Sequence, residues 1–574
     1  MGSRHSSSQY QTELNYNMSN KFDSDVLVVG AGPVGLTLAT DLAQRGVTVL
    51  MAEIREFAQP PNVKCNHVSA RSMEHFRRLG VVQTLRAAGL PEDYPNDVVF
   101  RTSMTGMELT RIPIPSRSKR YTESEGPDTG WETPEPPHRI NQIYLEPLLL
   151  KHAISHKGLS LRNRTQVIDI MQDDEGVNVS LLNLDTQEIQ TVRVRYLVGC
   201  DGGSSFVRKK IGAKLEGTEM IQRVQSTYIH APDLIHLLPG KPAWCYYSVN
   251  TRRCGTVFAI DGHEKWLVHN HLNPTEPEFD SVDRDQSIRN ILGVDANFKY
   301  EIITKEDWVG RRLLANQFRD RRVFLAGDAA HLWVPYAGYG MNAGIADATN
   351  LAWLLDAAIK GWAAPSILDA YEAERFPITE QVSHFVMNHA QKMIKARRAV
   401  PHNIEAMDAE GEAARAATGS EAYELNVQQF CCEGLNFGYY YEGSPIIAHE
   451  ETTAPAYSMG SFTPSTLPGC RTPHFWLDNG SSLYDLLGNG YSLLRLDDTV
   501  DVQAFLDQAS AHQVPITYID LSKQTRLPAA YEHKLILCRT DQHVVWRGDN
   551  LIDSWEDLMP LLKGHAQKSS QHSS

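Results

Sequence analysis

The feature that most constrains the fold is a glycine-rich turn between a strand-like and a helix-like segment near the start of the chain. An apolar, β-branched run at 25–29 is followed by Gly30, Gly32 and Gly35 in the spacing G-x-G-x-x-G. A segment with helical spacing and a second apolar run come next, and that run ends at Glu53. This order predicts a βαβ unit of a parallel sheet whose turn cradles a dinucleotide.

Each part of this unit has a physical role in nucleotide binding. The first glycine permits the tight turn, the second lets the backbone approach a pyrophosphate, and the third permits close packing of helix on strand. The positive end of the helix faces the phosphates, and the acidic residue that closes the second run can hold ribose hydroxyls. The predicted cofactor-binding residues of the unit are Gly30, Gly32, Pro33, Val34, Gly35 and Glu53.

Composition and charge narrow the function classes. The 574 residues carry a formal net charge of −14, and 42% of them are hydrophobic. This composition supports at least one large core, and the negative balance argues against a nucleic-acid partner, because phosphate binding requires clustered Lys and Arg. No apolar run reaches the roughly 18 residues that a spanning helix needs, so we predict no membrane segment.

The cysteine pattern and the N-terminal segment indicate the cellular compartment. The eight cysteines include neither a C-x-x-C pair nor zinc-type spacing with histidine, so we expect reduced thiols and no metal site. Residues 1–20 are polar and contain no apolar signal segment, and we expect a disordered tail or an expression remnant there. Both observations predict a cytoplasmic protein.

Shifts in composition divide the rest of the chain. Residues 97–138 are rich in Pro, Ser and Thr, and 211–308 alternate apolar with polar residues, as strands of an antiparallel sheet do. The predicted fold class is α/β, with a Rossmann-like domain interleaved with an antiparallel-sheet domain and followed by a small α/β module. The predicted boundaries are 21–96, 139–210 and 319–400 for the Rossmann-like domain, 97–138 and 211–318 for the sheet domain, 401–467 for a helix and linker, and 468–574 for the module.

Two further motifs follow predicted strands. Asp201-Gly202 comes directly after a strand-like run, and Gly327-Asp-Ala-Ala-His331 follows another. Together with the glycine-rich turn, and in this order, they resemble the class A flavoprotein monooxygenases, the para-hydroxybenzoate and phenol hydroxylase superfamily, over residues 23–400. The segment Pro468-Gly-Cys-Arg-Thr-Pro-His474 and its surroundings resemble the thioredoxin-like domain that phenol hydroxylases carry.

The resemblance implies an FAD-binding domain, a substrate domain formed by the antiparallel sheet, and roles for individual residues. Asp328 matches the residue that binds the ribityl chain of FAD, and Asp201 matches an aspartate associated with both FAD and pyridine nucleotides. Gln142 matches a flavin-contacting glutamine, and Arg71 matches an arginine that approaches the flavin phosphates. Pro335 matches the proline beside the isoalloxazine ring.

A predicted helix at 341–359 follows these motifs. Gly340, Met341 and Asn342 lie at its N-terminus, where free backbone N–H groups would face the flavin pyrimidine. Reduced flavin is anionic there, and a helix N-terminus favours negative charge. We therefore expect these three residues to bind the cofactor.

The resemblance also implies an activity. It predicts an NAD(P)H- and O₂-dependent monooxygenase that hydroxylates a phenolic or electron-rich aromatic compound through a flavin C4a-hydroperoxide. Several phenol hydroxylases have an Asp or His at the position of Asn66, which cannot act as a base, so the neighbouring His67 is the candidate for substrate activation. Pro335 and Tyr336 are the other predicted catalytic residues.

Substrate contacts are less defined than cofactor contacts. Trp333 flanks Pro335 and is expected to line the cavity over the flavin. Tyr246, Tyr247 and Arg252 are further candidates from the antiparallel segment. The expected partners are a small aromatic substrate, O₂ and NADPH or NADH, and the C-terminal module suggests a homodimer.

Two other functions remain open at this point. The same flavin chemistry could carry out epoxidation or Baeyer–Villiger oxygenation of a non-phenolic substrate, which the missing carboxylate at Asn66 favours. The chain could also be a flavin-binding protein without turnover.

Overall fold

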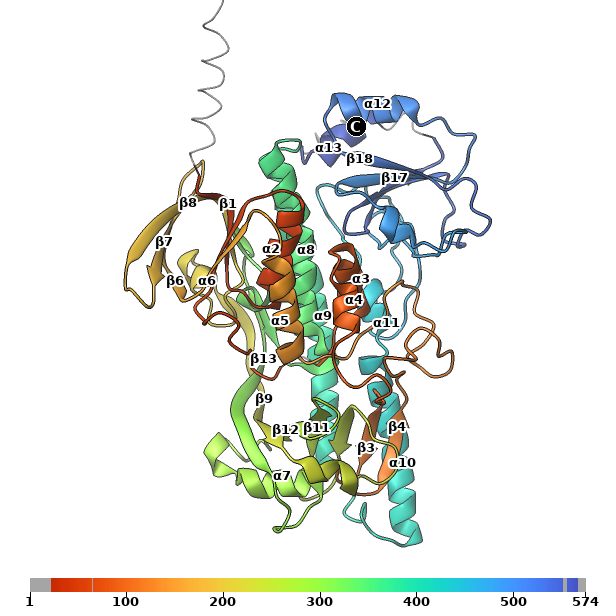
Figure 1. The fold of residues 1–574 in the computed structure, drawn as a ribbon. Coiled ribbons are helices and arrows are strands. Elements are labelled where there is room, and N and C mark those ends of the chain that lie inside the picture. The colour runs from red at the N-terminus through yellow and green to blue at the C-terminus, as the bar shows by residue number, and fades with distance from the viewer. Residues whose placement is uncertain (1–21, 65, 551–554, 566–574) are drawn as a thin grey trace, which may run out of the picture.

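The computed structural model describes residues 22–64, 66–550 and 555–565, and the predicted tail at 1–20 lies outside them. Three sheets organise the described residues (Figure 1). The two larger sheets lie one above the other in Figure 1, and the small C-terminal unit packs beside the helices of the first. This arrangement matches the predicted fold class.

The first sheet carries the glycine-rich turn. Its central strand β1 is flanked by two parallel neighbours, β2 and β8, and is completely buried over Val26–Val28. A strand buried on both faces needs an unbroken apolar sequence, which explains the run at 25–29. The strands in order are β14 (Arg319–Asp320), β15 (Val323–Leu325), β8 (Ile189–Gly199), β1 (Ser24–Val29), β2 (Val49–Ala52) and β5 (Leu159–Arg162), with β6 (Thr165–Gln172) and β7 (Val177–Asn183) attached through β8.

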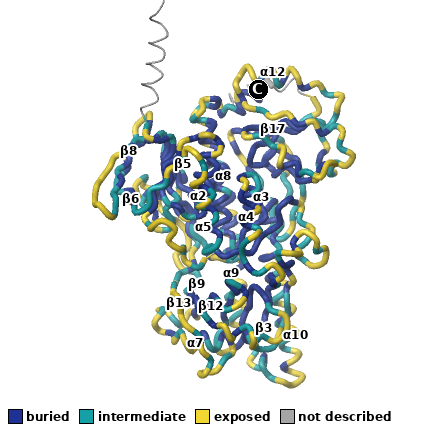
Figure 2. The backbone as a smooth tube through the Cα atoms, in the orientation of Figure 1, coloured by how far each residue is buried: buried dark blue, intermediate teal, exposed yellow. Residues whose placement is uncertain are grey.

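Helices cover this sheet. α2 (Pro33–Gln44) and α6 (Phe206–Lys210) contact its strands. α5 (Gln142–Ala153) and α8 (Tyr339–Lys360) pack on α2, α3 (Ala70–Arg78) packs on α8, and α4 (Val82–Arg86) packs on α3 and α5. Figure 2 shows the most deeply buried backbone where α2 and α8 meet the sheet, and exposed backbone mainly at the outer loops. The inner parts of α2 and α8 are buried, whereas Gly32, Gly338 and Gly340 at or near their N-termini are partly exposed.

The second sheet forms the predicted substrate domain. Its strands in order are β16 (His331–Trp333), β13 (Glu301–Ala315), β9 (Leu215–His230), β12 (Lys265–His271), β11 (Gly255–Ala259), β10 (Cys245–Ser248), β3 (Val98–Arg101) and β4 (Glu108–Ile112), with α7 (Arg284–Leu292) alongside. β16 is a departure from the predicted boundaries, because it lies within 319–400 yet pairs with β13. The segment that leads into Pro335 therefore passes from one sheet to the other.

Two long helices connect the parts. α9 (Asp369–Arg398) runs from the first sheet to the second in Figure 1, and α10 (Ala409–Phe430) packs against β4. α10 lies in the segment predicted as helix and linker, where Ala and Glu favour helix, and Gly419 lets α10 approach β4 closely. A Cβ at Gly419 would lie 2.3 Å from the carbonyl oxygen of Leu109. The short helix α11 (Glu433–Phe437) follows.

The C-terminal unit contains the third sheet. Its strands in order are β18 (Ile516–Asp520), β17 (Tyr491–Arg495), β19 (Leu535–Arg539) and β20 (Val544–Gly548), with α12 (Gln503–Ala511) and α13 (Trp555–Leu562). Buried ion pairs join it to the first unit: Arg539 to Glu374 at 2.6 Å and Arg471 to Glu74 at 2.5 Å. Across the described residues, no helix is long and apolar enough to cross a membrane.

Candidate active site

The glycine-rich turn leaves open space where a phosphate would bind. Gly30 has a φ of +101°, and a Cβ there would lie 2.5 Å from the carbonyl oxygen of Cys200. A Cβ at Gly35 would lie 2.1 Å from the carbonyl oxygen of Gly30, so helix and strand are in close contact. A Cβ at Gly32 would meet nothing within 4 Å. Gly30 and Gly35 are therefore required by the turn and its packing. Gly32 leaves the N-terminus of α2, which begins with Pro33 and Val34, open to a ligand.

Glu53 lies at the end of β2, beside this opening. Its carboxylate accepts the Ala31 N–H at 2.7 Å and the Arg55 Nε–H at 3.2 Å. Burial alone would raise the pKa of Glu53, but the hydrogen bonds from Arg55 and Ala31 lower it, so the group is ionised. Arg55 also bonds to Glu146 at 2.7 Å. The predicted ribose-binding carboxylate is thus held in place by a fixed ionic network.

A cavity of about 240 Å³ opens at this network. It is lined by Gly32, Arg55, Gln59, Pro60, Pro61, Asn62, Lys64, Gln142 and Glu146. Gln142 is the first residue of α5; its backbone N–H donates to the Lys64 carbonyl oxygen at 3.0 Å and its amide to Glu146 at 2.9 Å. Gly32 and Gln142, which are predicted site residues from two distant segments, therefore line one cavity together with the basic residues Arg55 and Lys64.

The two predicted aspartates differ in their surroundings. Asp201 caps α6, accepting the Ser205 hydroxyl at 2.5 Å and the Phe206 N–H at 2.7 Å. The Asp328 side chain is accessible, and within the described residues no hydrogen bond occupies its carboxylate. Dense protein around it raises the pKa of Asp328, an effect that His331 and Lys64 partly offset. Asp328 is therefore the carboxylate with acceptor capacity to spare for a ligand hydroxyl.

Asp347 of α8 holds the loop that carries Asp328. This buried carboxylate accepts the Gly327 N–H at 3.1 Å, bonds to His331 Nε2 at 2.8 Å and pairs with Arg375 at 2.8 Å. Three groups from separate segments fix the loop onto the helix. His331 accordingly has a structural role.

The start of α8 is tied to the segment around His67. Gly338 precedes the helix with a φ of +60°, and Asn342 donates to the His67 carbonyl oxygen at 3.2 Å and accepts the Ser69 N–H at 2.9 Å. Gly340 faces Trp333, since a Cβ there would lie 3.4 Å from the indole Nε1. Met341 is buried in the core of the first unit. The predicted flavin-facing residues thus form one ordered helix start.

His67 is buried and receives a hydrogen bond from Arg139 at Nδ1. Burial lowers the pKa of His67 well below its ordinary value, and the charges of Arg139 and Arg120 lower it further. A guanidinium only donates, so Nδ1 accepts and the proton of the neutral imidazole lies on Nε2. Within the described residues, no hydrogen bond involves that Nε2 atom. His67 can therefore donate a hydrogen bond to a ligand, and its predicted role in substrate activation stays a prediction.

Pro335, Tyr336 and Trp333 lie where the chain passes between the two sheets. Pro335 is exposed, and the ring of Trp333 stacks on His331 at 4.7 Å with its Nε1–H unpaired within the described residues. The Tyr336 hydroxyl accepts from Arg397 at 3.1 Å and lies 3.5 Å from Gln222. These three predicted residues occupy one short segment directly before α8.

The candidate substrate residues from the antiparallel segment lie in different surroundings. Tyr246 is completely buried, and its hydroxyl accepts the Ala243 N–H at 2.7 Å, which supports a packing role. Tyr247 stacks on Phe100 at 4.6 Å, and its hydroxyl accepts from Gln429 at 3.1 Å. Arg252 lies at the rim of a different cavity, where it pairs with Glu405.

Arg71 faces the C-terminal unit. Its guanidinium donates to Glu74 at 2.8 Å, to the Tyr439 hydroxyl at 3.2 Å, and to Gln542 and the Asp541 carbonyl oxygen. Arg71 is also not among the residues that line the cavity at Gly32. These contacts favour a role at the junction between the units, and its predicted contact with the flavin phosphates stays a prediction.

Several basic residues at the site escape sequence reasoning. Arg55, Lys64, Arg139 and Arg397 belong to none of the motifs, and solvated arginines and lysines are common. The sequence signal for two of them is their closeness to predicted site residues: Arg55 lies two residues after Glu53, and Arg139 lies three residues before Gln142. Tertiary contacts, not spacing, give these residues their surroundings.

The residues present fit flavin adenine dinucleotide (FAD). Gly32 leaves room at the start of α2, and Asp328 offers a free acceptor. Lys64 and Arg55 line the adjoining cavity, where Lys64 pairs with Glu306 and Arg55 pairs with Glu53 and Glu146. The start of α8 lies beside Pro335. Phosphate, ribityl and ring groups would each meet a suitable partner.

Comparisons with known proteins agree with this fit. Residues 23–386 match the family described as FAD binding domain, and residues 465–562 match the family described as aromatic-ring hydroxylase, C-terminal. Aklavinone 12-hydroxylase RdmE of Streptomyces purpurascens is 31% identical, with 95% of this chain and 98% of that protein covered. Phenol 2-monooxygenase of a Pseudomonas species is 28% identical, with 96% and 94% covered.

Solved structures show the same similarity. The rebeccamycin biosynthetic enzyme RebC with reduced flavin has a TM-score of 0.84 and 31% identity, with 95% of this chain and 99% of that one covered. Aklavinone-11 hydroxylase in complex with FAD and aklavinone has a TM-score of 0.77 and 28% identity, with 95% and 99% covered. The chain therefore belongs to the FAD-binding aromatic-ring hydroxylases, the class A flavin monooxygenases, and FAD is its cofactor.

Proposed function

We propose that the protein uses NAD(P)H and O₂ to hydroxylate a phenolic or similarly electron-rich aromatic substrate. The observation that carries the proposal is the arrangement before α8, where Pro335, Tyr336 and the donor His67 surround the start of the helix. A Cβ at Gly338 would lie 3.3 Å from His67 Cδ2, the ring carbon next to Nε2. A buried donor at this point would orient a substrate oxygen and exclude water.

FAD, when bound, supplies hydride acceptance and oxygen activation. The chain's own residues bind and orient: the start of α2 and Lys64 would hold the phosphates, and Asp328 the ribityl hydroxyls. Asn342 fixes the His67 segment to α8, so the donor and the cofactor site keep one relative position. Arg139 keeps the His67 proton on Nε2.

A second candidate is epoxidation or Baeyer–Villiger oxygenation of a non-phenolic substrate. Asn66 is not a base, and His67 is held as a donor, so neither residue is suited to deprotonate a phenol.

The test is a panel of substituted phenols, aminophenols and hydroxylated heterocycles, with NADPH and NADH consumption and product formed measured together. We expect at least one compound to stimulate oxidation and to gain one oxygen atom on its ring by mass spectrometry. Oxygen inserted next to a carbonyl or across a double bond would favour the second candidate. No stimulated oxidation with any compound would favour a flavin-binding protein without turnover.

The proposal also covers the oligomeric state and the cellular location. A homodimer through the C-terminal unit and a cytoplasmic location stay predictions, and light scattering of the purified holoprotein checks the first.

A further inference from the structure

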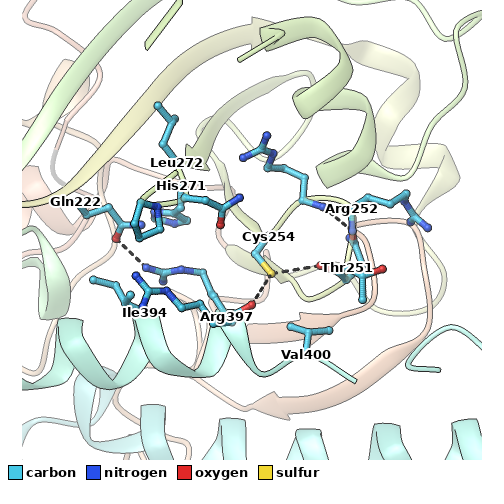
Figure 3. A pocket seen from close by; sticks show the side chains of 14 residues that line it. Gln222, Thr251, Arg252, Cys254, His271, Leu272, Ile394, Arg397 and Val400 are labelled. Atoms are coloured by element: carbon cyan, nitrogen blue, oxygen red, sulfur yellow. Dashed lines mark hydrogen bonds between the residues drawn. The ribbon is translucent and has the colours of Figure 1, made fainter. Parts of the chain in front are cut away.

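A second cavity, of about 340 Å³, lies between the second sheet and the end of α9 (Figure 3). Its polar wall contains Asn250 and His271 beside four arginines, and its apolar wall contains Leu272, Pro274, Ile394 and Val400. The volume is in the range of small-molecule sites, and most of the lining residues are polar or charged, which favours a ligand with a polar or charged group. The cavity can therefore hold an aromatic ring with a polar substituent.

Two of the four arginines already have carboxylate partners. Arg252 pairs with Glu405, and Arg253 pairs with Glu276 at 2.8 Å. Arg397 and Arg398 form no ion pair within the described residues. In a chain with a net charge of −14, this cavity thus keeps a surplus of positive charge.

Arg397 is held in position by neutral groups. It donates to Gln222 Oε1 at 2.7 Å and to the Tyr336 hydroxyl at 3.1 Å, and Figure 3 shows it reaching from α9 toward Gln222. A half-buried guanidinium gains most from an anion, because a charged hydrogen bond is stronger than a neutral one and its planar fork matches a carboxylate. Among the residues described, nothing supplies that anion.

The same hydrogen bonds connect the cavity to the reaction site. Tyr336 directly follows Pro335 and leads into α8, so a ligand held by Arg397 lies next to the segment beside the flavin. His271 adds no charge, because burial and the Arg397 charge lower its pKa well below the ordinary value. The positive charge available to a ligand therefore comes from arginine.

We propose that this cavity is an anion-binding site in which Arg397 binds the carboxylate of an acidic aromatic substrate. The inference rests on the proposed function and adds a substrate class to it. Arg397 acts as a specificity residue, and Tyr336 and Gln222 position it. The phosphates of NADPH are the other source of an anion, and the test separates the two.

The experiment measures binding to the FAD-loaded protein by the change in flavin absorbance, without turnover. The probes are 3-hydroxy-2-naphthoate, its neutral amide, and 2′,5′-ADP. We expect the acid to bind about tenfold or more tightly than the amide in the wild type, since a charged hydrogen bond is at stake. Arg397→Gln is expected to remove this difference by weakening only the acid, and Arg397→Lys to restore part of it.

Arg526→Gln is the matched control, because it removes the same charge from an exposed residue of the C-terminal unit. It is expected to leave all three probes unchanged, and flavin content checks that each variant is folded. Equal binding of acid and amide, or an Arg397→Gln variant that binds the acid like the wild type, would overturn the proposal. So would an Arg397→Gln variant in which only the binding of 2′,5′-ADP is weakened. Because binding is read without turnover, these outcomes are independent of whether hydroxylation itself is found.

Discussion

At the scale of single residues, the contact between Arg139 and His67 determines which protons are available beside α8. Arg139 is 5% exposed, lies over the ring of Trp244 at 4.6 Å, and has one nitrogen, Nη2, without a partner within the described residues. Its donation to His67 Nδ1 leaves Nε2 as a donor. A histidine in this state stabilises a substrate oxygen and does not remove a proton from it.

This contact leads to a prediction about pH. Because burial and the charge of Arg139 hold the pKa of His67 well below its ordinary value, the residue is neutral at neutral pH, and its titration should not control the hydroxylation rate there. His67→Leu should reduce product formed per NADPH consumed by up to about tenfold, the effect of one hydrogen bond. His67→Gln, which keeps a donor, should lose less.

The measurement is the coupling ratio of each variant between pH 5.5 and 9. A wild-type profile with a step near pH 6.5 that disappears in His67→Gln would identify His67 as a base and contradict its assignment as a donor.

Gly32 gives a second prediction at this scale. Its φ is −78°, which any residue can adopt, and a Cβ would meet no protein atom. Gly32→Val should therefore fold normally but lose bound FAD, since the new side chain occupies the phosphate space. Absorbance at flavin wavelengths and far-UV circular dichroism measure the two effects. Gly35→Val is the contrast, because its Cβ would clash with Gly30 and both fold and flavin should be lost. Full flavin occupancy in Gly32→Val would refute the phosphate site.

At the scale of elements, buried charges connect α3 and α9 to the C-terminal sheet. Arg539 of β19 pairs with Glu374 of α9 and with Asp541, and the side chains of both Arg539 and Glu374 are completely buried. The Ser444 hydroxyl donates to the same Glu374 at 2.6 Å. The junction therefore depends on complete pairing, because an unpaired charge there has no access to water.

We expect Arg539→Leu to lower the free energy of unfolding by about 3–5 kcal/mol, because it leaves Glu374 and Asp541 buried without a cation. Chemical denaturation followed by fluorescence measures the change. Arg495→Leu is the matched control: Arg495 lies on β17 of the same sheet and pairs with Asp520 at the surface, so little change is expected. Equal effects of the two substitutions would show that the junction is no more sensitive than the surface.

The elements also show how far sequence reasoning reaches. The βαβ unit, the antiparallel sheet and helix α8 could be predicted, because their patterns of burial repeat along a short stretch of chain. For α10 only a helix somewhere within 401–467 could be predicted, since its sequence lacks an apolar stripe and its docking depends on Gly419 meeting β4. Likewise, β16 joins the second sheet through pairing with β13, and pairing between distant segments leaves no periodic signal.

The candidate site divides in the same way. Gly30, Gly32 and Gly35 follow from local backbone needs, so their positions could be read from spacing. The partner of His67 could not, because Arg139 is 72 residues away and its guanidinium reaches Nδ1 only in the folded chain. Charge surplus in the cavity at Arg397 depends on which arginines find carboxylates, which is again a property of the fold.

At the scale of the whole molecule, buried histidines connect stability to pH. Among the described residues, burial lowers the pKa of six buried histidines; it is about 3 for His138 and His474 and about 4 for His389 and His543. His67 and His75 are lowered well below 6.5. Below pH 6.5 the unfolded chain binds protons at these histidines and the folded chain does not, so acid favours unfolding.

The expected result is a loss of stability as the pH falls from 7 to 5, with each histidine contributing up to about 1.4 kcal/mol per pH unit below 6.5. Denaturation midpoints at several pH values measure it. His138→Phe or His389→Phe should reduce the dependence of the free energy of unfolding on pH. A stability that is constant between pH 7 and 5 would contradict the buried, neutral state of these histidines.

The interleaving of the two larger units has a consequence for how the protein is made. The cofactor cradle joins Gly32 near the start of the chain to Asp328 and the first turn of α8, almost three hundred residues later. During synthesis, the phosphate end of the cradle would emerge long before the part that holds the ribityl chain and the ring. FAD capture must then wait until α8 has left the ribosome, and until that moment the first sheet lacks β15 and the helix that covers its centre. During synthesis, FAD would therefore bind only after more than half of the chain has been made.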